Sequence, residues 1–94
     1  MKLRFTRQAL ADLENAHTYV AERNPRAAAA TAARIRDAID GLILFPDRGR
    51  AGRISGTREL VIPATPFIVA YRIGNGHVDV LAIMHGARLW PGAL

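Results

Sequence analysis

The chain of 94 residues contains no cysteine, which excludes disulfide bonds and thiolate metal sites. This absence fits a reducing cytoplasm, where we expect the protein to act. No apolar run approaches the ~20 residues that a membrane helix needs, and no signal-peptide core follows Lys2 and Arg4. The three histidines lack metal-ligand spacing, and the sequence has no phosphate-binding loop and no dinucleotide-binding motif. We therefore expect no metal, no organic cofactor and no membrane partner.

Lysine is nearly absent as well: only Lys2 among the 13 basic residues is not arginine. The net charge is +5 and the isoelectric point is about 11.1. Guanidinium groups pair bidentately with phosphates and carboxylates, so this charge is typical of a protein that binds nucleic acid or an acidic protein. A GC-rich genome would also raise the arginine content without a functional reason. The placement of the arginines therefore has to decide between these explanations.

The first half of the chain predicts a helical hairpin after a short edge strand over residues 2–5. Thr6 is a suitable N-cap for the first helix, and Asn24 with Pro25 is a suitable start for the second. We expect Pro46 to end the second helix. The apolar face of the first helix is predicted to hold Leu10, Leu13, His17 and Val20. That of the second is predicted to hold Ala28, Ala32, Ile35, Ile39 and Leu42.

The second half predicts a loop over 46–56 and then three strands, over residues 57–62, 67–73 and 77–84. The order β-α-α-β-β-β is typical of an α+β domain, with the helical hairpin packed on a small, mainly antiparallel sheet. At this length we expect one domain over 1–94.

Asn75-Gly76 predicts a type I′ turn between the last two strands. A two-residue turn there puts Arg72 opposite Asp79. One face of the strand pair is then predicted to hold Phe67, Val69, Tyr71, Val78, Val80, Ala82 and Met84, and to meet the helices. The other face is predicted to hold Ile68, Ala70, Arg72, Asp79, Leu81, Ile83 and His85.

A series of short residue groups, in a characteristic order and spacing, extends over nearly the whole chain. They are Phe5-Thr6, Ala9, Asp12-Leu13, Tyr19-Val20, Asn24 to Ala28, Ile39, Leu42, Phe45-Pro46, Gly49-Arg50, Arg58 to Leu60, Tyr71 to Ile73, Val80-Leu81 and Met84 to Gly86. In this order the chain resembles the RelE/ParE superfamily of toxins.

The resemblance implies a toxin of a type II toxin-antitoxin system, neutralised by an acidic cognate antitoxin with which it forms a hetero-oligomer. RelE-like members cleave messenger RNA on the ribosome, whereas ParE-like members inhibit DNA gyrase and cleave no RNA. The resemblance favours the ParE-like branch for this chain, because the basic residues that RelE-like toxins carry on their middle strands are mostly absent. Ile68, for example, stands where those toxins have an arginine.

A metal-free ribonuclease needs a proton acceptor and cations that stabilise the developing phosphorane charge. The candidates for that chemistry are Arg88, which matches a catalytic arginine of RelE-like toxins, together with His85 and Arg58. Tyr71 falls on the inward face of its strand, so we expect it in the core.

The candidates for binding a target or the antitoxin are Arg72, Arg58, Arg50, Arg53 and Trp90. Each has a structural alternative. Arg72 would form an ion pair with Asp79, Arg58 would lie on a solvated edge, and the loop arginines would be mobile solvated charges. Trp90 would cover the edge of the sheet instead of stacking on a base.

The sequence thus favours a growth-inhibiting toxin that binds DNA gyrase. The alternative is a ribosome-dependent mRNA endoribonuclease, and a toxin that has lost its activity is a third possibility. Whether the chain is an enzyme stays open at this point.

Overall fold

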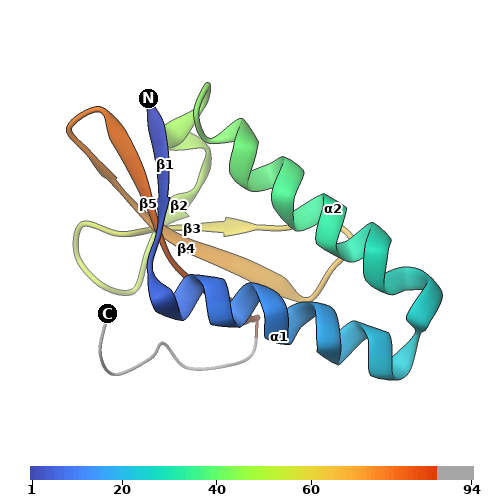
Figure 1. Cartoon of the computed structure of the whole chain (residues 1–94). Coiled ribbons are helices and arrows are strands. Elements are labelled where there is room, and N and C mark those ends of the chain that lie inside the picture. The colour runs from blue at the N-terminus through green and yellow to red at the C-terminus, as the bar shows by residue number, and fades with distance from the viewer. Residues whose placement is uncertain (87–94) are drawn as a thin grey trace.

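The computed structural model of the protein describes residues 1–86, in which helices and strands follow the predicted α+β order (Figure 1). The elements are β1 (Lys2–Phe5), α1 (Arg7–Arg23), α2 (Pro25–Gly41), the 3₁₀ turn η1 (Pro46–Arg48), β2 (Arg50–Ala51), β3 (Arg58–Val61), β4 (Phe67–Gly74) and β5 (His77–His85). Two elements were not predicted: the stretch 46–56 contains η1 and β2, and is not a plain loop.

The two helices begin where the sequence predicts. The Thr6 hydroxyl accepts a hydrogen bond from the Ala9 amide at 3.0 Å, and the Asn24 side chain accepts one from Ala27 at 3.3 Å. The predicted end of the second helix is wrong, because α2 stops at Gly41 and Pro46 instead opens η1. The segment between them is a turn, in which the Phe45 amide still donates to the carbonyl of Gly41.

The predicted apolar face of α1 is correct only in part. Leu13 and Val20 pack against the core as predicted, but the buried residues are Ala9 and Ala16, while Leu10 is 55% exposed and His17 is also exposed. The alanines face the sheet because a side chain without bulk lets the helix approach it closely. The spacing of large apolar residues therefore pointed to a neighbouring face of the helix.

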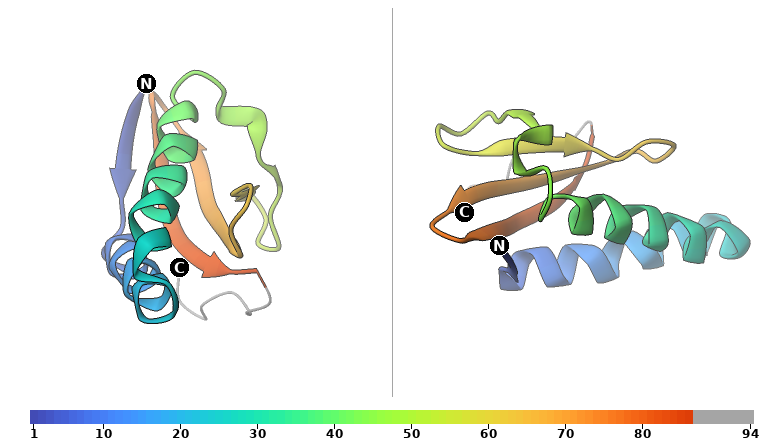
Figure 2. Two further views of the ribbon diagram at one scale, coloured as in Figure 1. Left: turned by 90° about the vertical axis from the view of Figure 1, so that its right-hand side faces the viewer. Right: turned by 90° about the horizontal axis from the view of Figure 1, so that it is seen from above.

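The five strands form one mixed sheet in the order β1-β5-β4-β3-β2. β1 pairs in parallel with β5, and the other pairs are antiparallel. The helical hairpin covers one face, and α2 lies in front of the strands in the left view of Figure 2. Among residues 1–86 no helix lies on the opposite face, which we call the helix-free face.

The predicted faces of the strand pair are wrong beyond a β-bulge between β4 and β5. Near the turn the register is as predicted, with Arg72 opposite Asp79, but Ala70 pairs with Ala82 while Tyr71 pairs with Val80. The extra residue, Leu81, reverses the alternation of β5 beyond it. Ala82 and Met84 consequently lie on the helix-free face with Ile68 and Ala70, and Ile83 joins the core under the helices. His85 lies on the same face as Ile83, and therefore not on the face of Arg72 as predicted.

The turn that sets this register has the predicted length but not the predicted type. Asn75 and Gly76 are its two loop residues, since Gly74 pairs with His77. A type I′ turn needs a positive φ at both positions, and here only Gly76 has one, at +72°.

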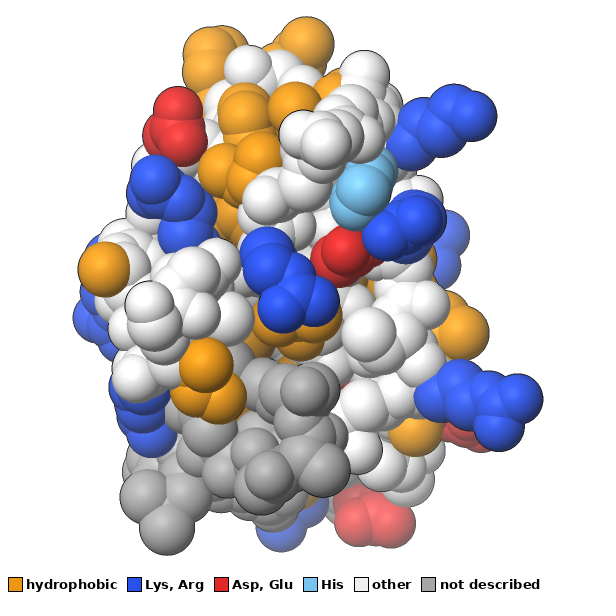
Figure 3. Space-filling model, turned by 90° about the vertical axis from the view of Figure 1, so that its left-hand side faces the viewer, with side chains coloured by type: hydrophobic (Ala, Val, Ile, Leu, Met, Phe, Trp, Pro, Cys, Tyr) orange, Lys and Arg blue, Asp and Glu red, His pale blue; other side chains and the backbone are white. Residues whose placement is uncertain are grey.

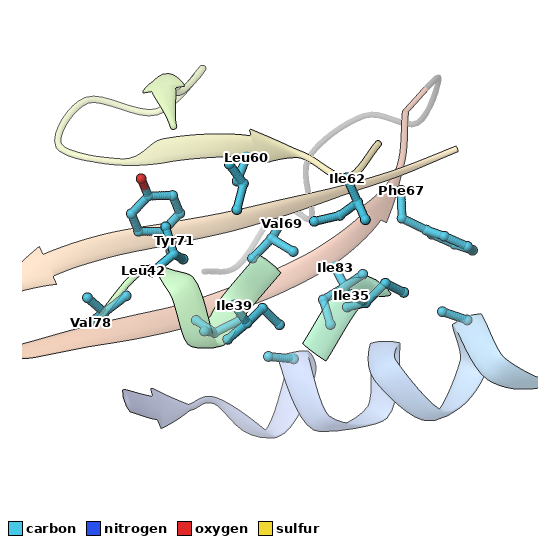
Figure 4. Packing of buried hydrophobic residues seen from close by; sticks show 13 residues of the cluster. Ile35, Ile39, Leu42, Leu60, Ile62, Phe67, Val69, Tyr71, Val78 and Ile83 are labelled. Carbon is cyan, nitrogen blue, oxygen red and sulfur yellow. The ribbon is translucent and has the colours of Figure 1, made fainter. Parts of the chain in front are cut away.

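The main core lies between the helices and the sheet (Figure 4). Ile35, Ile39 and Leu42 point from α2 and the turn after it toward Val69, Tyr71 and Val78. All of these side chains are at most 2% exposed. At roughly 1.5–3 kcal/mol for each large aliphatic side chain buried, this cluster supplies much of the favourable free energy of folding. No helix among the described residues is long and apolar enough to cross a membrane.

Candidate partner-binding site

The basic segment from Pro46 to Thr57 is fixed to the sheet through the Tyr71 hydroxyl. That hydroxyl donates to the carbonyl of Pro46 at 2.6 Å and accepts from the amide of Gly49 at 2.8 Å. Burial raises the pKa of the Tyr71 phenol, so the hydroxyl keeps the proton that it donates. A side chain at position 49 would meet the Tyr71 ring at 2.7 Å, which explains the glycine. Tyr71 is therefore a core residue, as expected, and also an anchor.

Glu59 is the second anchor of this segment. Its side chain is 2% exposed and receives Arg50 Nη2 at 3.3 Å, the Arg53 amide at 3.1 Å and Arg53 Nε at 3.7 Å. A carboxylate buried this deeply needs such partners, since an unpaired buried charge is very costly. Arg50 and Arg53 are thus held in position and are not the mobile solvated charges of the structural alternative.

Arg58 is held beside the first anchor. Its guanidinium contacts Asp47 Oδ1 at 3.3 Å and donates to the carbonyl of Gly49 at 2.9 Å. The solvated-edge alternative is wrong, because β2 pairs with β3 and takes the edge position. Arg58 stabilises the segment that carries Arg50 and Arg53.

Asp79 forms an ion pair, but Arg4 and not Arg72 is its partner. Arg4 Nε lies 2.8 Å from Asp79 Oδ1, and a second guanidinium nitrogen lies 3.2 Å from Oδ2. His77 Nε2 lies 3.4 Å from the same Oδ2. The hydrogen bond from Arg4 holds the pKa of Asp79 below its usual value, and the same contact raises the pKa of Arg4. Arg72, directly across from Asp79 on β4, is exposed and forms no ion pair within residues 1–86.

His85 lies at the other end of the sheet, on the face that carries the helices. Its ring makes edge contacts with Tyr19 at 5.7 Å and Phe67 at 6.0 Å between ring centroids. It lines a shallow pocket with Asp12, Asn15 and Glu22. His85 pairs with Phe67 while Arg58 pairs with Tyr71, a separation of four residues along β4, or about 13 Å. These two ribonuclease candidates do not meet. The other, Arg88, lies outside the described residues, as does Trp90.

Among the described residues, no three His, Cys, Asp or Glu side chains lie close enough together to hold a metal ion.

A family model described as the ParE toxin of the type II toxin-antitoxin system parDE matches residues 3–90. The chain belongs to this family. It is 42% identical over 93 residues to Y4kP of Sinorhizobium fredii, a protein named as a proposed toxin, with 99% of this chain and 96% of that protein covered. It is 38% identical to toxin RelE2 of Caulobacter vibrioides, over 90% of this chain and 94% of that one.

The fold of this ParE-family chain also matches a solved structure, a chain from the chromosomal ParDE toxin-antitoxin system of P. aeruginosa. The TM-score is 0.82, the sequence identity 25%, and the match covers 90% of this chain and 95% of that chain. The protein is therefore a toxin of the RelE/ParE superfamily, and membership implies an antitoxin partner.

The sequence did not indicate the role of two residues of this candidate site. Arg4 was assigned only to an edge strand, and Glu59 only to the group Arg58 to Leu60 that carries the resemblance. The parallel pairing of Arg4 with Asp79 joins residues 75 positions apart and leaves no local signal. For Glu59 the sequence does contain a local signal, because an acidic residue lies within a predicted strand directly after a segment rich in arginine.

Proposed function

We propose that this toxin arrests growth by binding DNA gyrase, and that it performs no RNA cleavage. The observation that carries the proposal is the match to the ParE family over residues 3–90, and the separation of His85 from Arg58 adds that these two residues do not act together in one ribonuclease site. A general base and the cation that assists it must both lie within hydrogen-bond reach of the reacting atoms. Two groups about 13 Å apart along a strand do not meet that condition.

The proposed antitoxin is an acidic protein that folds on the toxin as a hetero-oligomer. The net charge of +5 and the fixed arginines Arg50 and Arg53 support an acidic partner. We propose that the chain acts in the cytoplasm as a single domain over 1–94, where it meets gyrase and is neutralised by the antitoxin.

A ribosome-dependent ribonuclease is the second candidate. It is favoured by the names of two relatives, RelE2 and RelE1 of Caulobacter vibrioides, of which RelE1 is 35% identical over 81 residues. Its catalytic residue would be Arg88, with His85 or Arg58 assisting.

Two assays on the purified toxin separate the candidates. The first measures supercoiling of relaxed plasmid by DNA gyrase at increasing toxin concentration. The second measures cleavage of messenger RNA on translating ribosomes. The proposal predicts inhibition in the first assay, intact messages in the second, and recovery of supercoiling when antitoxin is added. Cleaved messages with unaffected supercoiling would overturn it.

A further inference from the structure

The helix-free face of the sheet carries cations and carboxylates in alternation. Cross-strand partners point to the same face, so the register places Arg4, Asp79 and Arg72 in one row across β1, β5 and β4. The next row runs from Ala82 and Ala70 to Glu59 and Arg50, across β5, β4, β3 and β2. Figure 3 views this side, opposite to the left view of Figure 2, and shows Lys and Arg side chains spread across it with acidic ones among them.

The carboxylates in these rows orient the guanidinium groups. Asp79 binds Arg4 through both oxygens, at 2.8 and 3.2 Å, and Glu59 binds Arg50 and Arg53. Each of these arginines remains well exposed, with 62% of the side chain in solvent for Arg4, 61% for Arg50 and 44% for Arg53. The guanidinium groups of Arg4 and Arg50 are therefore fixed in place while largely exposed, which lowers the entropic cost of binding a partner.

Arg72 lies between these two groups of arginines. It is exposed and forms no ion pair within residues 1–86, although its charge contributes to the lowered pKa of Asp79. With Lys2 and the arginines at positions 4, 50 and 53, the described part of this face has five cations against the two carboxylates. An exposed arginine at the middle of such a face, with no ion-pair partner among residues 1–86, favours a carboxylate or phosphate from outside.

We propose that the helix-free face binds an acidic polypeptide segment, with Arg72 and Arg4 as its main contacts. One observation favours a polypeptide over a single-stranded nucleic acid. The described residues of this face offer no aromatic ring for stacking, apart from His77, whose imidazole packs over Gly74 and bonds to Arg4.

Apolar side chains continue the same face beyond the charged rows. Ile68 and Met84 pair there with each other and are buried, at 7% and 5% exposure, while Val61, which pairs with Ile68, is 50% exposed and is the accessible apolar side chain of this row. A segment that places acidic residues on the arginines would extend apolar residues toward Val61. The inference rests on the proposed function, because a toxin that inhibits by binding needs a surface for a protein.

The test measures binding of poly-glutamate by fluorescence anisotropy at fixed salt. The double variant Arg4→Gln/Arg72→Gln is compared with Arg26→Gln/Arg34→Gln, whose arginines are exposed on α2. Both variants lose two positive charges, so general attraction falls equally. We expect the first pair to weaken binding about tenfold or more, and the second at most two- to threefold. Equal weakening by the two pairs overturns the inference.

A single-stranded oligonucleotide of the same length and charge is the second probe. The inference predicts that it binds more weakly than poly-glutamate and responds equally to the two double variants. If it binds more tightly and only Arg4→Gln/Arg72→Gln weakens it, the face binds nucleic acid and the inference is wrong. Gyrase inhibition by the unmodified toxin is measured separately, so failure of the inference and failure of the proposed function are distinguishable.

Discussion

The two faces of the sheet have opposite compositions although they come from the same strands. The face under the helices is apolar, with Val69, Tyr71 and Val80 all at 0% exposure. The helix-free face has Arg4, Arg72 and Asp79 at one end and a small apolar cluster at the other. In a chain of 94 residues one face has to supply most of the stability. The other face is then free to hold charges whose main effect is on binding.

The largest expected effect compares one valine on each face. Val69→Ala removes two methyl groups from a fully buried site and leaves a cavity, so we expect a loss of about 2–3 kcal/mol in the free energy of unfolding. Val61→Ala, at a half-exposed site on the helix-free face, should change it by less than about 0.5 kcal/mol. Urea denaturation followed by circular dichroism measures both. Similar losses for the two variants would show that the faces share the stability.

The second prediction concerns the anchor of the basic segment. Tyr71→Phe removes the hydroxyl that joins Pro46 to Gly49 and leaves both backbone groups without that partner. We expect a loss of about 1–3 kcal/mol, or roughly 4–8 °C in Tm for each kcal/mol, with faster amide exchange at Gly49.

Tyr19→Phe is the matched control for this anchor, since the Tyr19 hydroxyl bonds to none of the described residues. It should leave the stability and the exchange rates nearly unchanged. An equal effect of the two substitutions would mean that the Tyr71 hydroxyl holds nothing in place.

The smallest expected effect is a pH dependence of the Arg4–Asp79 pair. The pKa of Asp79 is lowered in the folded protein, so the pair stabilises the fold above the ordinary aspartate pKa of about 3.9. That contribution is lost as the pH falls through the lower, folded value. Asp79→Asn should therefore lower Tm slightly at pH 6, and by a smaller amount as the pH falls toward 2. A Tm difference of the same size at both pH values would assign the stabilisation to something other than charge.

Much of the fold follows from local signals in the sequence. Thr6 and Asn24 both cap helices, and the pair Asn75-Gly76 sets the register that places Arg72 opposite Asp79, because each of these effects depends on a few neighbouring residues. The bulge at Leu81 had no such signal. It moved His85 to the helix face and so separated it from Arg72.

The candidate site was predicted only in part, for a related reason. Arg72, Arg50 and Arg53 were named from their residue type and position. Two sets of ion pairs organise this site: Arg4 pairs with Asp79, and Glu59 pairs with Arg50 and Arg53. These pairs depend on contacts across strands. An alternating pattern gives the face of a residue but not its neighbour on the next strand.

The central claim is that the helices and the apolar face hold the fold while the helix-free face binds an acidic polypeptide segment, which we propose belongs to the poisoned partner. Pulse labelling of DNA, RNA and protein synthesis after brief expression tests it most directly, with the unmodified toxin beside Arg4→Gln/Arg72→Gln. We predict that the unmodified toxin stops DNA synthesis first with messages intact, and that the double variant, although folded, does not. Early arrest of translation with cleaved messages, or full toxicity of the double variant, would contradict the account.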